Sequence, residues 1–192
     1  MKLIYTASQV REAEKPYIEA ADYDGYLMQR AADAVAAEAQ DLLHGKENAK
    51  ILLLIGPGNN GADTIYAGAR LSAKGHRVDA VIFDSSEKNL ELIAREGGEG
   101  TRVLDPEHTL EQLAGYDLTI DGILGTGSSG AVRGSAGEYL GVLRAAQLDG
   151  KLGAVLAVDT PSGVDNNRGT VHEPSLRADR TVTFIGHKLP AG

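Results

Sequence analysis

The spacing of hydrophobic residues along the chain changes near residue 45. Before that point, Thr6 and Gln9 form a capping-box pattern that predicts a helix over about 7–20. Apolar residues at helical spacing predict a second helix over about 25–44. After that point, short aliphatic runs such as Ile51–Ile55 alternate with amphipathic segments. A continuous aliphatic run is typical of a strand buried on both faces, so the pattern predicts a buried sheet with helices around it.

The expected elements alternate along the rest of the chain. We expect strands over 51–55, 77–83, 101–104, 117–123, 153–158 and 181–185, and helices over 62–74, 87–96, 109–114 and 137–148. Such alternation is typical of βαβ units, whose right-handed crossovers build a mostly parallel, doubly wound sheet. No repeat of fixed period and no interdomain linker interrupts the pattern. We therefore expect an α/β fold with residues 1–192 in a single domain.

Composition and charge narrow the classes of function. The net charge of −8 argues against a nucleic-acid surface, which needs a basic patch, and gives little reason to expect binding to anionic lipid. The chain has no cysteine, which excludes disulfides, thiolate metal sites and cysteine nucleophiles. Its longest aliphatic runs are too short to span a bilayer. We expect a cytoplasmic protein without a membrane or nucleic-acid partner.

Three of the expected strands end in loops that are rich in glycine and in oxygen-bearing side chains. These loops cover residues 56–63, 121–134 and 159–165. In an open α/β sheet, ligands bind beyond the carboxyl ends of the strands. Glycines there let backbone amides face a ligand, and a helix that starts at the loop favours an anionic group. The pattern predicts a phosphate-bearing ligand.

The dinucleotide-binding pattern G-x-G-x-x-G occurs twice, which shows how weak it is in a chain with 24 glycines. It is matched from Gly56 to Gly61 and again from Gly125 to Gly130. The first match has Asp79 and Asp84 about 20 residues downstream, where a dinucleotide-binding fold places the acid that holds a ribose. An NAD-dependent dehydrogenase is therefore one alternative function.

The same loops carry a candidate cation site. Asn60, Asp121 and Ser162 supply an amide, a carboxylate and a hydroxyl group, and hard oxygen donors of low total charge suit a hard cation of low charge. Simpler interpretations exist for each loop. Asn60-Gly61 can be an ordinary turn, Asp159 can terminate a strand, and Ser162 can cap a turn. The shared position at the strand ends favours the functional interpretation.

Four stretches, taken in order, carry a family resemblance. They are Gly-Pro-Gly-Asn-Asn-Gly-Ala-Asp from Gly56, Asp-Gly-Ile-Leu-Gly-Thr-Gly from Asp121 with Val132-Arg133-Gly134, residues 158–165, and residues 178–184 with Lys188. Together they resemble the YjeF N-terminal domain family, the NAD(P)H-hydrate epimerases.

The resemblance implies a three-layer αβα, Rossmann-like fold, usually dimeric, and an isomerase that interconverts the R and S epimers of hydrated NADH or NADPH. It implies one potassium ion on Asn60, Asp121 and Ser162. The implied substrate contacts are Asn59, Asn60, Gly61, Ala62, Asp63, Gly125, Thr126, Gly127, Ser128, Ser129, Gly130, Ala131 and Asp159.

This chain departs from the family pattern in two of its motifs. Ala62 and Thr64 replace two glycines, and Gly130 and Ala131 replace a basic and an acidic residue. The chain also stops soon after Lys188, so it is either a short member or a piece of a longer bifunctional protein. The resemblance implies a partner enzyme, fused or separate: an ADP- or ATP-dependent NAD(P)H-hydrate dehydratase.

Asp159 is our candidate for the catalytic acid/base. A carboxyl group beside C6 of the hydrated ring can protonate the leaving hydroxyl group and then deprotonate the returning water. The main rival from another class is a binding or scaffold protein with the same fold. The joint presence of Asn60, Asp121, Asp159 and Ser162 favours the enzyme.

Overall fold

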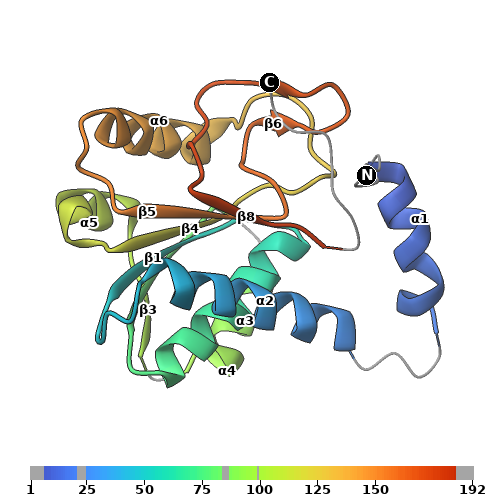
Figure 1. Ribbon diagram of the computed structural model, residues 1–192, viewed down its shortest axis with the longest axis horizontal. Helices are drawn as coiled ribbons and strands as arrows, with labels where there is room; N and C mark the ends of the chain where they lie inside the picture. Colours follow the sequence, from blue (N-terminus) through green and yellow to red (C-terminus); the bar gives the residue numbers. More distant parts are fainter. Residues whose placement is uncertain (1–6, 21–24, 84–86, 99, 185–192) are drawn as a thin grey trace.

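The computed structural model describes residues 7–20, 25–83, 87–98 and 100–184. Two helices, α1 (Ala7–Ile18) and α2 (Tyr26–Leu42), precede the first strand. Helix α1 stands beside the rest of the molecule, while α2 packs against the sheet (Figure 1). Among the described residues, no helix combines the length and the apolar character needed to cross a bilayer.

A six-stranded parallel sheet forms the centre of the molecule. Its strands are β1 (Lys50–Ile55), β2 (Arg77–Ile82), β3 (Thr101–Val103), β4 (Leu118–Gly122), β5 (Ala154–Val158) and β8 (Arg180–Val182). Their order is β3-β2-β1-β4-β5-β8, and every neighbouring pair is parallel. The predicted doubly wound parallel sheet is therefore confirmed.

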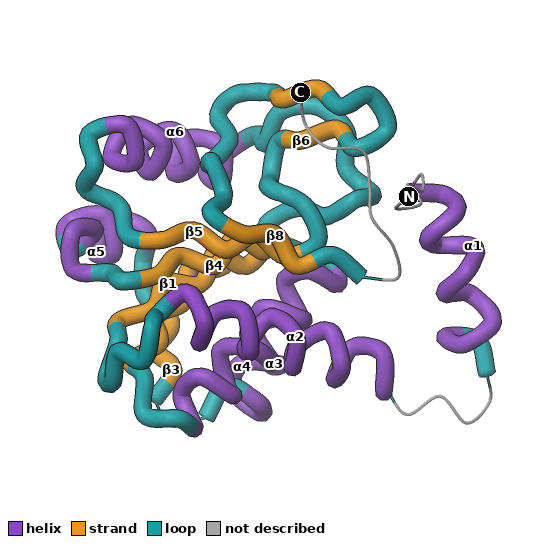
Figure 2. The backbone as a smooth tube through the Cα atoms, viewed as in Figure 1, coloured by secondary structure: helices purple, strands orange, loops and turns teal. Residues whose placement is uncertain are grey.

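Helices cover both faces of this sheet, as the tube view shows (Figure 2). Helices α2, α3 (Asn59–Ala73) and α4 (Glu87–Glu96) pack on one face, and α5 (Pro106–Glu111) and α6 (Gly134–Leu148) pack on the other. Strand β1 shows why helices pack on both faces of the sheet. Ile51, Leu53 and Ile55 belong to the first core cluster, whereas Leu52 and Leu54 belong to the second. The alternation of side chains along a strand thus produces the αβα sandwich.

The order of the strands reverses beside β1. The chain runs outward from β1 through β2 to β3, and then returns to place β4 on the other side of β1. The connections after β1 and β4 therefore leave toward opposite faces of the sheet. A crevice opens between them at the carboxyl ends of the strands, which is the usual ligand position in such folds.

Several boundaries differ from the predicted ones. Helix α3 begins at Asn59 rather than at 62, so Asn60-Gly61 lies in the first helical turn and is not an ordinary turn. Helix α5 begins at Pro106 rather than at 109, because proline is well suited to the first position of a helix. Helix α6 begins at Gly134 rather than at 137, and a short 3-10 helix covers Leu113–Gly115.

A small antiparallel hairpin was not predicted. Strands β6 (Val164–Asp165) and β7 (Thr170–Val171) pair outside the main sheet, and two-residue strands carry too little periodicity to be recognised. Other predictions fall outside the described residues. These are the capping residue Thr6, the candidate ribose acid Asp84, residue 185 of the last strand, and Lys188.

Candidate functional site

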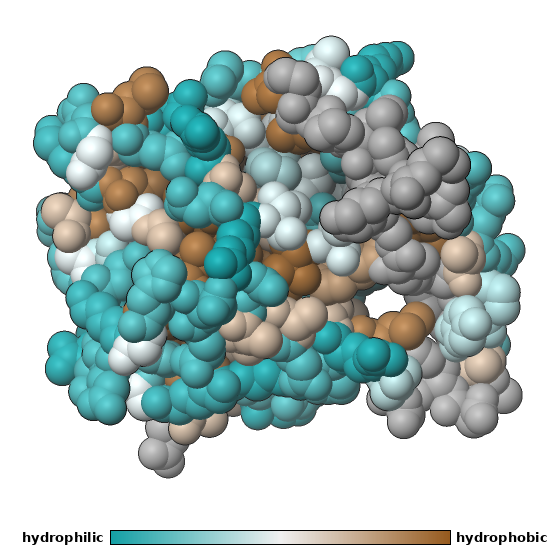
Figure 3. All heavy atoms as spheres, viewed as in Figure 1, coloured by the Kyte–Doolittle hydropathy of each residue, from teal (hydrophilic) through white to brown (hydrophobic). Residues whose placement is uncertain are grey.

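A cavity of about 810 Å³ lies beyond the carboxyl ends of β1, β4, β5 and β8. The surface is hollowed between α1 and the body of the molecule, with apolar atoms beside the opening (Figure 3). The cavity is lined by Val10, Leu27, Met28, Arg30, Ala31, Pro57, Gly58, Asn59, Asn60, Asp63, Ile123, Leu124, Gly125, Thr126, Gly127, Ser128, Asp159, Thr183 and Phe184. It has room for a ligand of the size of a small organic molecule or part of a dinucleotide.

Asn60 ties three strand-end segments together. Its side-chain Nδ2 donates to the carbonyl oxygen of Leu124 at 3.0 Å and to that of Val158 at 2.7 Å. A Cβ atom at Gly125 would lie 2.7 Å from Asn60 Oδ1, so only glycine lets the second loop approach this closely. Sequence position alone predicted that the three loops converge, and the structure brings them together.

Asp121 and Ser162 form a second link between loops. The Ser162 hydroxyl donates to Asp121 Oδ1 at 2.6 Å, and the Ser162 backbone N–H donates to Oδ2 at 2.8 Å. The Ile123 N–H donates to Oδ1 at 3.3 Å, and both side chains are fully buried. Burial raises the pKa of the Asp121 carboxyl, and these hydrogen bonds offset part of that effect.

Asp159 lies in the wall of the cavity at the end of β5, with 9% of its surface exposed. Its backbone has a φ of 67°, a left-handed conformation that costs a non-glycine residue free energy. Its Oδ2 accepts a hydrogen bond from the Thr126 N–H at 2.9 Å, and Thr183 Oγ1 lies 3.5 Å from Oδ1. These contacts hold the carboxylate at the cavity wall in spite of the strained backbone.

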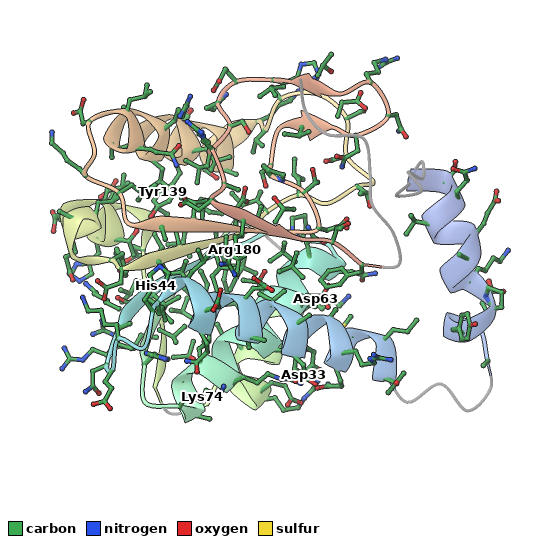
Figure 4. All side chains as sticks on the ribbon, in the orientation of Figure 1. Asp33, His44, Asp63, Lys74, Tyr139 and Arg180 are labelled. Carbon is green, nitrogen blue, oxygen red and sulfur yellow. The ribbon has the colours of Figure 1, made fainter. Side chains whose placement is uncertain are left out.

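The predicted substrate contacts divide into two groups. Asn59, Asn60, Asp63, Gly125, Thr126, Gly127, Ser128 and Asp159 line the cavity. Gly61 and Ala62 are buried in the first turn of α3, while Ser129, Gly130 and Ala131 lie outside the lining. Asp63 is placed where α3 begins, at the end of the sheet where β8 finishes (Figure 4). What these residues bind stays a prediction.

Sequence reasoning missed the wall of the cavity that α1 and α2 supply. Leu27, Met28, Arg30 and Ala31 belong to the first turns of α2, and Val10 belongs to α1. These helices precede the first strand, so the rule that ligands lie at strand ends does not point to them. Thr183 and Phe184 follow β8 and could have been found by that rule.

Asp79 does not lie where a ribose-binding acid would. It is fully buried in the first half of β2, and its carboxylate accepts hydrogen bonds from Arg102 Nε and from the Tyr116 hydroxyl, both at 2.8 Å. It is absent from the lining of the cavity. Of the two candidate ribose acids, the one that the structure describes therefore cannot hold a ribose, which removes support from the dehydrogenase alternative.

The fold and the cavity define a doubly wound α/β protein with a ligand-sized cavity at its topological switch point. The chain belongs to the family described as YjeF-related protein N-terminus, whose sequence profile matches residues 25–189.

Curated relatives agree with this assignment. The NAD(P)H-hydrate epimerase of Microbacterium testaceum is 37% identical over 183 residues, which cover 94% of this chain and 68% of the relative. The bifunctional NAD(P)H-hydrate repair enzyme Nnr of Mycobacterium tuberculosis is 31% identical over 192 residues, which cover 98% of this chain and 38% of that protein. The chain thus spans well under half the length of several bifunctional relatives that it matches.

A solved structure shares the fold. The crystal structure of the yeast protein ynu0 matches with a TM-score of 0.83 at 21% identity, covering 98% of this chain and 82% of the yeast chain. At this identity the match shows the three-layer Rossmann-like architecture alone.

Proposed function

We propose that the chain is an NAD(P)H-hydrate epimerase, an isomerase that interconverts the R and S epimers of hydrated NADH or NADPH. The names of the Microbacterium testaceum and Rhodopirellula baltica relatives support this proposal. The observation that carries it is the carboxylate of Asp159, held by the Thr126 N–H in the wall of a cavity large enough for a reduced nicotinamide ring.

The chemistry that this carboxylate must assist is simple. Hydrated NADH carries a hydroxyl group on C6, next to the ring nitrogen. The nitrogen lone pair can form a C=N bond as the C6–O bond breaks and water leaves, which gives a planar iminium ion. Water that adds to the opposite face and loses a proton restores the hydrate with inverted configuration.

Asp159 would act as the acid and then as the base. As a carboxylic acid it protonates the departing hydroxyl group, and as a carboxylate it stabilises the cation and removes a proton from the incoming water. One of its oxygens is oriented by the Thr126 N–H. A group held in place in this way does not have to be ordered during the reaction.

The first turn of α3 would bind a phosphate group of the substrate. Gly58 at the N-cap has no side chain to satisfy the first N–H groups of this helix of 15 residues, and it lines the cavity with Asn59. Free N–H groups and the positive end of the helix dipole favour an anion at this point.

Potassium fits the oxygen donors of the half-buried Asn60 and the buried Asp121 and Ser162. Among the described residues no lysine or arginine pairs with Asp121, so its negative charge has no internal counter-ion. A cation held by these oxygen donors would compensate that charge and order the three loops. Its low charge density suits this role better than that of a strong Lewis acid.

Two partners belong to the same proposal. The substrate is a small dinucleotide, and its product would be consumed by an ADP- or ATP-dependent dehydratase, either fused to this domain or separate. The bifunctional names of several relatives support the fused form. We also propose that the domain acts as a homodimer.

Incubation with the R epimer of hydrated NADH tests the proposal directly. Chromatography should show conversion to the S epimer well above the slow spontaneous rate. A protein that binds the dinucleotide without exceeding that rate would be a binding or scaffold protein. Oxidation of NADH coupled to reduction of an organic substrate would indicate a dehydrogenase.

A further inference from the structure

The described side chains that line the cavity carry more negative than positive charge. Asp63 and Asp159 are acidic, and Arg30 is the one cationic side chain among the described lining residues. Residues 124–128, which also line the cavity, carry no charged side chain. A dinucleotide brings at least two further negative charges with its phosphate groups. A positive side chain at the cavity would offset these charges in addition to the start of α3, and among the described lining residues this side chain is Arg30.

The surroundings of Arg30 differ from those of several other arginines of the chain. Arg70, Arg102, Arg168 and Arg180 each pair with a carboxylate of the chain. Arg30 Nη1 instead donates to the Tyr26 hydroxyl at 2.9 Å, and its guanidinium carbon lies 5.4 Å from the centre of the Tyr26 ring. No carboxylate in the described part of the chain forms an ion pair with it.

Tyr26 and Arg30 are one helical turn apart at the start of α2, and Arg30 lines the cavity. The phenol ring and hydroxyl group of Tyr26 hold the guanidinium group at the cavity without neutralising its charge. A guanidinium group has five N–H donors in a planar fork, so several remain to face an incoming oxyanion.

We infer that Arg30 binds a phosphate group of the dinucleotide at the mouth of the cavity, in a position set by Tyr26. This inference rests on the proposed function for the identity of the ligand. The planar fork matches two phosphate oxygens at once, and such charge-assisted pairs are stronger than neutral hydrogen bonds. The phosphate is either the pyrophosphate common to all such dinucleotides or the 2′-phosphate that distinguishes NADPH from NADH.

Calorimetric titration with NADP⁺ and NAD⁺ tests the inference without any need for turnover. Arg30→Gln should raise the Kd of NADP⁺ about ten- to a hundredfold, the usual effect of losing hydrogen bonds to a charged group. Arg30→Lys keeps the charge and loses the fork, so its Kd should lie between those of the wild type and Arg30→Gln. The matched control is Arg77→Gln, which removes an exposed arginine outside the cavity and should leave both Kd values unchanged.

Comparison of NADP⁺ with NAD⁺ shows which of the two phosphate groups Arg30 binds. Weaker NADP⁺ binding with unchanged NAD⁺ binding assigns Arg30 to the 2′-phosphate, whereas equal loss for both ligands assigns it to the pyrophosphate. If Arg30→Gln binds both ligands as the wild type does, the inference is wrong. In steady-state assays Arg30→Gln should raise KM and leave kcat within about twofold, since the contact is remote from C6. A wild-type protein without epimerase activity would refute the proposed function, while the binding result would still decide the role of Arg30.

Discussion

Two buried carboxylates, Asp79 on β2 and Asp121 on β4, lie on either side of β1, and they differ in the groups that contact them. Arg102 Nη2 lies 2.7 Å from Asp79 and Lys50 Nζ lies 3.8 Å away, so two cations compensate its charge. Asp121 receives hydrogen bonds from Ser162 and Ile123, which orient it without adding a charge. Two cations thus compensate the carboxylate near the amino ends of the strands, whereas the described residues place no lysine or arginine on the one near the carboxyl ends.

Tyr116 completes the cluster around Asp79. Its hydroxyl donates to Asp79 at 2.8 Å, and the Lys50 ammonium group lies 4.3 Å from the centre of its ring. Burial raises the pKa of the Tyr116 hydroxyl, and the hydrogen bond to Asp79 raises it further. The hydroxyl therefore stays protonated and remains a donor. A carboxylate satisfied in this way has a structural role, whereas Asp159 lies in the wall of the cavity and Asp121 has no lysine or arginine beside it among the described residues.

Substitution of Asp159 should give the largest effect. Asp159→Asn keeps the shape of the side chain and removes its proton chemistry. We expect the epimerisation rate to fall by roughly 10²–10⁴-fold, measured above the spontaneous rate, because a positioned acid/base group contributes about that much. The melting temperature and NADP⁺ binding should stay close to those of the wild type. A mutant with the wild-type rate would make Asp159 structural and would direct attention to Asp63 or Asp121.

Substitution of Asp79 should affect stability instead. Asp79→Ala leaves the buried Tyr116 hydroxyl without its acceptor, while Lys50 and Arg102 can still reach water. We expect the free energy of unfolding in urea to fall by about 2–3 kcal/mol, less than for a pair whose cations are also buried. The specific activity of the folded protein should not change. Asp33→Ala is the control, because it removes an exposed carboxylate paired with Arg70 and should change stability little. A loss of activity per folded molecule in Asp79→Ala would contradict the purely structural role that we assign to Asp79 in contrast to Asp121.

Potassium should produce a smaller effect, and it should depend on Asp121. At a potassium concentration ten times its Kd, native-state binding would stabilise the protein by about 1.4 kcal/mol. Thermal-shift titration at constant ionic strength should show this stabilisation in the wild type and not in Asp121→Asn. An equal response to lithium, or none to any alkali ion, would count against a potassium site.

The smallest effect concerns pH and His76, which lies just before β2. His76 Nδ1 accepts a hydrogen bond from the Ala49 N–H at 3.2 Å. Burial lowers the pKa of His76 below its ordinary value, and the nearby charge of Lys74 lowers it further. The unfolded chain therefore binds this proton more readily than the folded one. The stability from neutral His76 is complete above about pH 6.5 and is lost as the pH falls toward the folded pKa.

Urea unfolding at pH 7 and pH 5 measures this effect. The free energy of unfolding should fall less between the two values in His76→Gln than in the wild type, whereas His108→Gln, a change at an exposed histidine, should behave as the wild type does. Equal slopes for all three proteins would show that His76 makes no difference to the pH dependence.

The sequence predicted the centre of the sheet well because its inner strands are buried on both faces. Ile51–Ile55 and Ala154–Val158 are continuous aliphatic runs, which solvent-exposed segments rarely contain. Helix starts were predicted less well. Asn59 and Gly134 begin helices in segments whose composition is typical of turns, and only packing against the sheet decides between the two.

In the candidate site, too, residues at strand ends were predicted better than residues placed by helix packing. Asn60, Asp121, Asp159 and Ser162 could be named from sequence because each lies at the end of a buried strand, where a parallel sheet gathers its loops. Arg30 could not, because its position at the cavity depends on how α2 packs across the sheet. Asp79 was assigned to a ribose from spacing alone, and spacing does not reveal that Arg102 and Tyr116 already occupy its carboxylate.

The two hydrogen bonds of Asn60 have a consequence for motion. They join the start of α3 to the segments that follow β4 and end β5, so none of the three can open without breaking a bond to another. Backbone amides in these segments should then exchange with deuterated water as one cooperative unit rather than as three independent loops. A ligand that orders one of them would slow exchange in all three. A single binding contact would thus stabilise all three segments at the ligand-facing edge of the sheet against local opening.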